Sequence, residues 1–409
     1  MIQPLPKTKT DSSSLVLSAL QANGLDTMPS NLTEQLAAIS PEMVRAELKQ
    51  EFVPFSLQRL MTLISPAAAD FLEEMAHISQ RLTRQRFGMT MNLYAPLYLS
   101  NLCVNKCLYC GFNTSHKIPR QHLSIDEAIT EAKILIAEGF QDILLVAGED
   151  RNNISIDYLE ELAKKLAPIA PSLALEIYPL ECAEYQRLFD AGIEAVTLYQ
   201  ETYDRKVYTK YHLAGPKANY ANRLKKQEDA ARAGMRRLGI GALLGLQDWR
   251  YEMLALGIHA QTLIKHFSAS RVSVSFPRLR PAPEIAELAA VAEQTANVSL
   301  ADDSINLKFQ HLVKDKDLAQ MVFALRLSFP DVALILSTRE KAAFRNNLIP
   351  LGITQISAGS KTNPGGYGDE HESSEQFEVA DTRSAAEISV YLKNIGYDPV
   401  WKDWDKSFA

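Results

Sequence analysis

Apolar strand-like runs alternate with amphipathic helical patterns along most of this 409-residue chain, and no other feature restricts its fold as much. Eight runs are predicted to be strands: Leu93–Leu99, Asp142–Ala147, Leu173–Pro179, Ala195–Gln200, Leu238–Leu246, Val272–Phe276, Val332–Ser337 and Thr354–Ala358. Several are apolar throughout, as expected for parallel strands that are buried on both faces. Eight β–α repeats predict an α/β fold, a (β/α)8 TIM-type barrel, with a doubly wound open sheet as the alternative.

Helical patterns fill most of the gaps between the strands and also precede the first one. The predicted helices are Ser30–Ser40, Pro41–Gln50, Ser65–Arg86, Ile125–Glu138, Ile156–Leu166, Ala183–Ala191, Tyr220–Ala233, Tyr251–His266, Lys314–Phe329, Lys341–Asn347 and Ser384–Asn394. We therefore divide the chain into a helical N-terminal extension (1–85), the barrel (86–382) and a C-terminal helix with a tail (383–409). The polar stretches 282–313 and 360–382 are long enough to be functional loops.

Charge and hydropathy exclude some classes of function. The net charge is −6, and this mildly acidic balance gives no reason to expect a nucleic-acid partner. We expect no membrane association, because no apolar run is long enough to cross a bilayer. The polar segment 1–14 does not resemble a secretory signal. Together these features predict a cytoplasmic protein.

Three of the four cysteines lie within eight residues, directly after the first predicted strand. The run Asn101-Leu-Cys103-Val-Asn-Lys-Cys107-Leu-Tyr-Cys110 resembles the motif of the radical S-adenosylmethionine (SAM) superfamily. Three thiolates can bind three irons of one [4Fe–4S] cluster, and the fourth iron then remains open to SAM. The alternative is a zinc site with His116 as the fourth ligand, but its spacing is irregular. We expect the remaining cysteine, Cys182, to be a small buried hydrophobe.

Five residues near the predicted strand ends are candidates for binding SAM. Tyr109 could stack near the adenine, although core packing would also explain it. Gly148 and Glu149 end the second strand, where a Gly-Glu pair could hold the SAM ammonium group through charge-assisted hydrogen bonds. Glu176 lies in an apolar strand and needs a partner, either SAM or an internal ion pair. Gly241 could let the adenine approach the backbone, or it could serve tight barrel packing.

Other segments make the resemblance more specific than the cysteine motif alone. They are similar to the 2-iminoacetate synthase (ThiH) family of tyrosine lyases in thiamine biosynthesis, and the similarity extends from about residue 65 to the C-terminus. The matching segments are Leu82–Gly88, Pro96–Cys103, Tyr199–Tyr203, Ser273–Pro281, Leu336–Glu340, Lys361–Tyr367 and Pro399–Asp405.

This resemblance implies a radical lyase reaction. A deoxyadenosyl radical would take a hydrogen from L-tyrosine, and the Cα–Cβ bond would then break to give 2-iminoacetate (dehydroglycine) and 4-methylphenol. An external one-electron donor would reduce the cluster. The imine is short-lived in water, so the resemblance also implies a complex with the thiazole synthase ThiG, which would receive it.

Five further residues are candidates for catalysis or tyrosine binding because they stand at strand ends. Arg278 and Arg280 follow the sixth strand, while Ser337 and Arg339 end the seventh. A guanidinium suits a carboxylate because two parallel N–H bonds fix its orientation. Glu201 ends the fourth strand and could take part in proton transfer or hold the substrate amine. The alternative for each arginine is a solvated surface ion pair.

Three other functions are open to such a sequence. The hydrogenase-maturation lyase HydG starts with the same cleavage but carries a second cluster in a C-terminal extension, and this chain has no cysteine after Cys182. A tryptophan-cleaving relative would differ mainly in the shape of the ring pocket. A non-catalytic Fe–S or zinc scaffold would not bind SAM.

Overall fold

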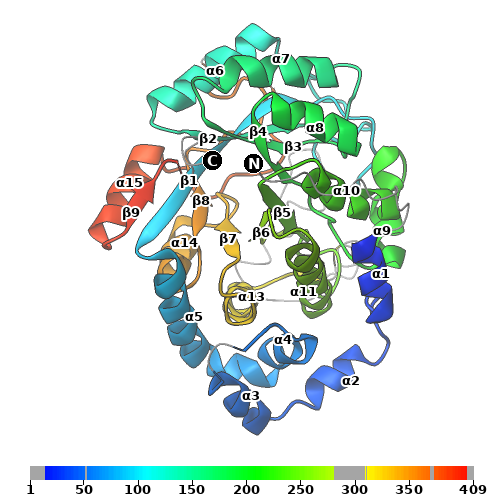
Figure 1. Cartoon of the computed structure of the whole chain (residues 1–409), viewed down its shortest axis with the longest axis vertical. Coiled ribbons are helices and arrows are strands. Elements are labelled where there is room, and N and C mark those ends of the chain that lie inside the picture. Colours follow the sequence, from blue (N-terminus) through cyan, green and yellow to red (C-terminus); the bar gives the residue numbers. More distant parts are fainter. Residues whose placement is uncertain (1–13, 51–52, 281–308, 310, 369–372, 403–409) are drawn as a thin grey trace, which may run out of the picture.

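Eight parallel strands close into a barrel in the computed structural model, which describes residues 14–50, 53–280, 309, 311–368 and 373–402. They are β1 (Thr90–Ser100), β2 (Asp142–Ala147), β3 (Ser172–Glu176), β4 (Ile193–Thr197), β5 (Arg237–Gly241), β6 (Arg271–Ser275), β7 (Ala333–Leu336) and β8 (Gln355–Ser357). Each pairs with the next, and β1 pairs with both β2 and β8 (Figure 1). The predicted barrel is confirmed. The open-sheet alternative is wrong, because an open sheet would have two edge strands with one neighbour each, whereas here β1 pairs with β8 and closes the ring.

Three strands end earlier than the sequence predicts. The predicted runs continue beyond β3, β4 and β5 into residues such as Ile177, Leu198 and Leu243, which are loop residues that remain buried. These apolar side chains pack at the carboxyl ends of the strands, so burial there imitates a longer strand. The short β9 (Asp398–Val400), which pairs with the start of β1, was not predicted.

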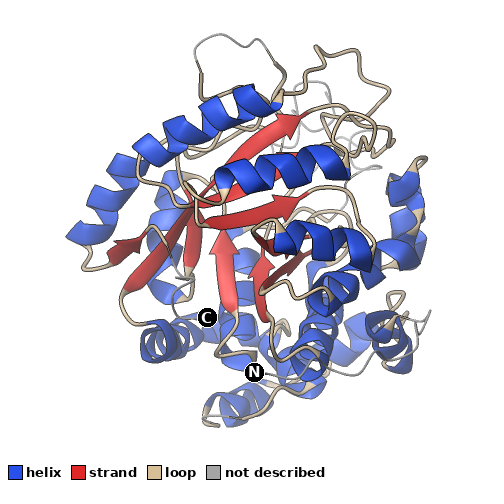
Figure 2. Ribbon diagram, turned by 45° about the horizontal axis from the view of Figure 1, so that its top comes forward, coloured by secondary structure: helices blue, strands red, loops and turns tan. Residues whose placement is uncertain are grey.

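Helices surround the barrel and connect its strands (Figures 1 and 2). They are α6 (Ile125–Ala137), α7 (Ile156–Leu166), α8 (Cys182–Asp190), α9 (Arg205–Tyr211), α10 (Tyr220–Arg232), α11 (Trp249–His266), α13 (Asp315–Ser328) and α14 (Ala342–Leu348). Of these, only α9 was not predicted; its first turn is fixed by Asp204, whose carboxylate accepts the N–H groups of Lys206 and Val207. Within the described residues, no helix combines the length and apolar character needed to cross a membrane.

The N-terminal helices lie outside the ring, against α10, α11 and α13 (Figure 1). They are α1 (Leu15–Ala22), α2 (Leu32–Ala37), α3 (Pro41–Leu48), α4 (Leu57–Leu63) and α5 (Leu72–Phe87). The sequence did not predict α1 or α4, and the predicted helix over 65–86 is a 3₁₀ turn (Ala67–Phe71) followed by α5. Buried contacts join this layer to the barrel, such as the Gln320 amide, which donates to the Leu63 and Ser65 carbonyls.

The C-terminal part crosses the upper mouth of the barrel, where the strands have their carboxyl ends, and then forms α15 (Ala385–Asn394) and β9. Buried Asp381 fixes this path through an ion pair with Arg345. The ring of Trp401 packs edge-on against Phe140, with their centroids 5.4 Å apart. Most of the predicted loop 282–313 and the tail from residue 403 lie outside the described residues, and the domain boundaries at 85 and 382 stay predictions.

Candidate active site

The cysteine loop lies between the end of β2 and the segment around α9. The Val104 N–H donates to the Glu149 carbonyl, and the Leu108 N–H donates to the Tyr211 carbonyl, both at 3.0 Å. None of the three cysteines is in a disulfide. Backbone hydrogen bonds on two sides therefore hold the loop at the carboxyl ends of the strands.

All three thiols, Cys103, Cys107 and Cys110, line one cavity of about 120 Å³ at the upper mouth. Among the described residues, no three His, Cys, Asp or Glu side chains are close enough together to bind one common metal ion. A cubane cluster needs another arrangement, with each thiolate on a different iron around a shared space, and the cavity offers that. Burial raises the pKa of Cys107, and that of Cys110 to about 11, in the metal-free chain. A bound iron reverses this preference and keeps the thiols ionised.

Tyr109 faces the same cavity and is fixed by a histidine that sequence reasoning missed. Its hydroxyl lies 2.8 Å from His212 Nε2, and His212 Nδ1 lies 2.7 Å from the Tyr208 carbonyl oxygen. Burial and the nearby Lys217 ammonium lower the pKa of His212 to about 3, so its ring is neutral. Since Nδ1 must then donate to the carbonyl, Nε2 accepts from the Tyr109 hydroxyl.

Gly148 and Glu149 follow β2 and form the wall of the cavity that packs against the cysteine loop. A Cβ on Gly148 would stand 2.2 Å from the Leu102 carbonyl oxygen, so only glycine permits this approach. The buried Glu149 carboxylate accepts from Asn105 Nδ2 at 2.8 Å and pairs with Arg223 at 3.0 Å. Arg223 and Asn105, which were not predicted, thus hold this carboxylate in position.

The backbone of Glu201, at the edge of the cavity, is strained. Its φ of 72° makes it the only non-glycine residue with positive φ among those described, a conformation that costs about 1 kcal/mol or more. Its carboxylate pairs with Lys217 at 2.6 Å and lies 3.5 Å from Arg223. Burial opposes its ionisation, but these two cations outweigh burial and lower its pKa. Glu201 is therefore an anion that holds Lys217 in the cavity.

Glu176 and Arg339 both line this cavity and a smaller one of about 50 Å³ below it. The Arg339 guanidinium stacks on Phe377, 3.3 Å from the ring centroid, and its charge has no ion-pair partner within the described residues. Glu176 likewise has no hydrogen-bond donor there. Burial raises the pKa of Glu176 to about 7, although Arg339 acts against this shift. An arginine without an ion-pair partner and a carboxyl group that is easily protonated therefore face the space between the cysteines and the barrel interior.

The two arginines after β6 are already paired. Buried Arg278 holds Glu340 through its Nε, at 2.9 Å, and its Nη2 atom; it also pairs with Asp315 at 2.8 Å and is not among the residues that line the cavity. Arg280 does line the cavity, and its Nη2 lies 2.7 Å from Glu340. Ser337 lines the smaller cavity. The geometry therefore favours Arg339 over Arg278 as a ligand for an anionic substrate.

Gly241 lies in tight packing, and the adenine contact expected for it stays a prediction. A Cβ at Gly241 would lie 2.8 Å from the Tyr199 ring and 2.9 Å from the Ser275 carbonyl oxygen. The space beside it is filled by protein, and Gly241 does not line the cavity of the three thiols. Its absent side chain serves tight packing inside the barrel, which was the alternative.

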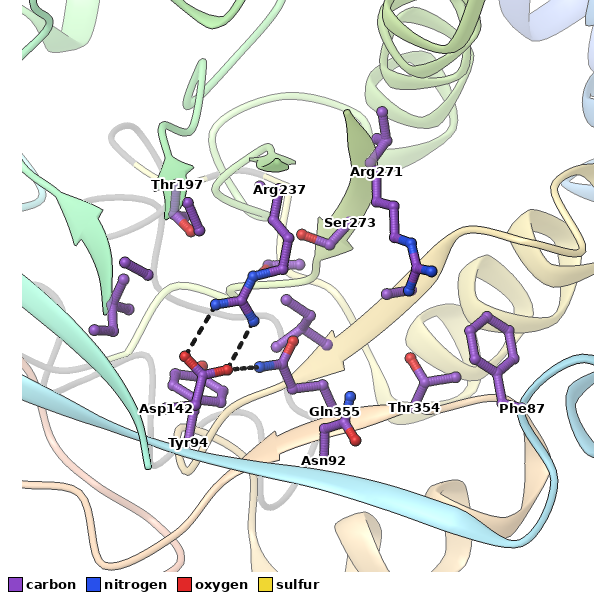
Figure 3. A pocket seen from close by; sticks show the side chains of 18 of the residues that line it. Phe87, Asn92, Tyr94, Asp142, Thr197, Arg237, Arg271, Ser273, Thr354 and Gln355 are labelled. Carbon is purple, nitrogen blue, oxygen red and sulfur yellow. Dashed lines mark hydrogen bonds and ion pairs between the residues drawn. The ribbon is translucent and has the colours of Figure 1, made fainter. Parts of the chain in front are cut away.

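A cavity of about 570 Å³, larger than the one that the thiols line, lies at the lower mouth, where the strands begin (Figure 3). Asp142 and Arg237 form a two-bonded ion pair at 2.8 and 3.2 Å, and the Gln355 amide donates to the same carboxylate at 3.3 Å. Arg237 also donates to the Ser172 hydroxyl. This cavity has more room than the upper one, but its lining includes no cysteine.

Two known families match successive parts of the chain. Residues 97–256, which hold the cysteine motif, the end of β1 and strands β2 to β5, match the Radical SAM superfamily. Residues 275–398 match the Biotin and Thiamin Synthesis associated domain. The second match covers Arg278, Arg280 and Arg339, so these arginines lie in the part shared with biotin and thiamin synthesis proteins.

Whole-chain relatives are more specific. The 2-iminoacetate synthase of Salmonella typhimurium is 42% identical over 347 residues, which are 85% of this chain and 86% of that protein. The Escherichia coli 2-iminoacetate synthase is 41% identical over the same shares. A crystal structure of HydG, a maturase of the [FeFe]-hydrogenase, superposes with a TM-score of 0.77 at 32% identity, covering 96% of this chain and 80% of that one. The chain therefore belongs to the 2-iminoacetate synthase family of the radical SAM superfamily.

Proposed function

We propose that the protein is a 2-iminoacetate synthase, a radical SAM lyase that cleaves the Cα–Cβ bond of L-tyrosine to 2-iminoacetate and 4-methylphenol for the thiazole moiety of thiamine. The observation that carries this proposal is the 42% identity to a 2-iminoacetate synthase across 85% of the chain. The cavity supports it, because three thiols, the unpaired Arg339 and the Glu176 carboxyl group share one small space.

The cysteines would hold one [4Fe–4S] cluster, with SAM on its open iron. Together, when bound, they would supply the radical that takes one hydrogen atom from tyrosine. Glu149 is the acceptor for the SAM ammonium group, and Arg223 and Asn105 hold its carboxylate in position. Tyr109, fixed by His212, forms a flat wall of the cavity where an adenine can stack.

Arg339 is the proposed ligand for the tyrosine carboxylate. Its guanidinium is unpaired, and stacking on Phe377 fixes its plane, so two parallel N–H bonds are available to a carboxylate. Glu176, across the cavity, suits the amino group, because a bound cation favours its ionised form. Arg280 and Ser337 complete the walls, while Arg278 and Glu340 support Arg280 from behind.

Two partners belong to this proposal. An external one-electron donor is needed twice in each turnover. One electron would reduce the cluster for the cleavage of SAM, and a second, with a proton, would convert the ring fragment left by the hydrogen abstraction into 4-methylphenol. The thiazole synthase ThiG would receive the imine, which water hydrolyses. The upper mouth is the side from which such a product can be handed over, because the cavity of the three thiols lies there.

An oxygen-free assay with SAM, a reductant and either tyrosine or tryptophan tests the proposal. We expect 4-methylphenol and 5′-deoxyadenosine with tyrosine, in equal amounts, and no cleavage of tryptophan. If tryptophan alone yields its ring-methyl product, the substrate assignment is overturned. If neither amino acid is cleaved and SAM does not alter the spectrum of the cluster, the protein is a scaffold.

A further inference from the structure

Gln376 brings the C-terminal part of the chain directly onto the cysteine loop. Its backbone N–H donates to the Thr362 carbonyl at 2.9 Å. Its own carbonyl lies against Gly111, the residue after Cys110, where an added Cβ would stand only 2.8 Å from the Gln376 oxygen. Since any larger residue at 111 would push the two segments apart, the backbone of Gln376 has a defined place on this loop.

The side-chain amide of Gln376 is fixed by two contacts. Its Oε1 accepts from the Tyr98 hydroxyl at 2.7 Å, and its Nε2 lies 3.8 Å from the Cys110 Sγ. A thiolate can only accept, so the amide presents its N–H to the sulfur and its oxygen to the phenol. Tyr98 is 5% exposed and packs edge-on against Phe112, so its ring is fixed and its hydroxyl orients the Gln376 amide.

Cys103 has a comparable contact from within the cysteine loop. Asn105 Nδ2 lies 3.7 Å from the Cys103 Sγ. The Asn105 side-chain oxygen accepts the backbone N–H of Lys217 at 2.9 Å. Asn105 is fully buried, so this amide is also held in one orientation. Two of the three thiols thus face an oriented amide N–H, one supplied locally and one from 266 residues further along the chain.

Such contacts influence electron transfer to an iron–sulfur cluster. Reduction adds a negative charge that is shared with the sulfur atoms, and hydrogen bonds to sulfur are among the factors that set the reduction potential. An N–H donor stabilises the more negative, reduced form more strongly. Each contact of this kind therefore raises the potential and makes the cluster easier to reduce.

We propose that Gln376, oriented by Tyr98, raises the reduction potential of the cluster by donating its N–H to the Cys110 thiolate. This inference rests on the proposed function, since it requires the cluster. It gives the segment that covers the upper mouth an electronic role in addition to closing the cavity. The residue acts through a ligand and does not touch the substrate.

The test is a redox-poised EPR titration of the reconstituted protein without SAM. In Gln376→Met, which keeps the side-chain length but removes the donor, the ratio of reduced to oxidised cluster at a fixed potential should fall about three- to tenfold. For one electron, tenfold corresponds to about 59 mV. Tyr98→Phe should give a smaller fall, because the N–H remains but is no longer oriented. Gln355→Met, the matched amide at the lower mouth, should leave the ratio unchanged.

The outcomes separate this inference from the proposed function. Equal or higher potential in Gln376→Met, at equal iron content, overturns the inference and leaves the lyase assignment intact. If Gln376→Met fails to retain iron, Tyr98→Phe decides the matter, and an unchanged potential in that variant overturns the inference. A wild-type protein that assembles no cluster overturns the proposed function itself.

Discussion

The two mouths of the barrel both contain carboxylates and guanidinium groups, but they use them differently. At the lower mouth, the Asp142 carboxylate on β2 is engaged by Arg237 on β5 and Gln355 on β8 (Figure 3). At the upper mouth, Glu176 and Arg339 line the cavity of the three thiols without an ion-pair partner in the described residues. An ionisable group held away from water without a partner destabilises the fold, so such a group is typical of a site where a ligand supplies the partner.

Cavity size is therefore a poor guide to function in this fold. The lower cavity is several times larger than the upper one, yet its main charges are paired with one another. The unpaired Arg339 and Glu176 and the three thiols that line one cavity identify the upper mouth, as expected for a TIM-type barrel, where the loops after the strands build the active site. The predictions below test this contrast.

Replacing Cys107 by alanine should abolish tyrosine cleavage. The thiol lines the upper cavity, and two thiolates are too few to hold the cluster in the proposed way. Iron content and product formation after anaerobic reconstitution measure the effect. Cys182→Ala is the matched control, because this cysteine lies on α8, outside the site, and should keep both iron and activity. Wild-type activity in Cys107→Ala would remove the loop from the mechanism.

Replacing one arginine at each mouth by alanine compares the two regions directly. Arg339→Ala should lower kcat/KM for tyrosine about 100-fold, because a two-bonded carboxylate contact is lost, while the cluster spectrum stays the same. Arg271→Ala removes a guanidinium from the wall of the lower cavity and should leave kcat/KM within twofold of the wild type. Similar losses in both variants would contradict the distinction between the mouths.

Removing the Arg237 guanidinium, which pairs with Asp142 at the lower mouth, should lower the stability of the fold and leave catalysis intact. Arg237→Met leaves the 7% exposed Asp142 side chain without its cation, which should lower the free energy of unfolding by about 2–3 kcal/mol. Denaturant unfolding gives the change, and turnover per folded, cluster-loaded molecule should match the wild type. A large fall in kcat for this folded variant would show that the lower mouth takes part in the reaction.

Glu176 should give the upper mouth a pH-dependent stability. Its pKa is raised to about 7 in the fold from an ordinary value of 4.5, so the folded protein holds the proton more tightly. Its contribution is complete below about pH 4.5 and is lost as the pH rises toward 7, by on the order of 1–3 kcal/mol. Unfolding at pH 5 and 7.5 without ligands should show this loss in the wild type and a smaller loss in Glu176→Gln. Equal losses in both proteins would contradict the pKa shift.

Much of the architecture could be predicted because its signals are local. Strand order, the helices around the barrel and the shared cavity of the three cysteines follow from apolar periodicity and from the short spacing in residues 103–110. The supporting residues could not be predicted this way. Arg223 and Gln376 meet Glu149 and Cys110 only through tertiary contacts over 74 and 266 positions, and their sequence neighbours carry no motif.

Gly241 and Arg278 illustrate a second limit. Gly241 became a candidate because a glycine lets a ligand approach the backbone, and Arg278 because it follows a strand in a segment similar to the family. The structure fills the space beside Gly241 with Tyr199, and it pairs Arg278 with Glu340. Whether a strand-end residue meets a ligand or a neighbouring side chain depends on packing from other elements, which a single sequence does not reveal.

EPR spectroscopy of the reduced, reconstituted protein, recorded before and after addition of SAM, tests the central claim most directly. The claim is that three thiols at the upper mouth hold one cluster whose fourth iron is open. We predict a [4Fe–4S] signal that changes when SAM binds, and the same change in Arg237→Met. A protein that retains no iron, or a signal that SAM does not alter, would contradict it.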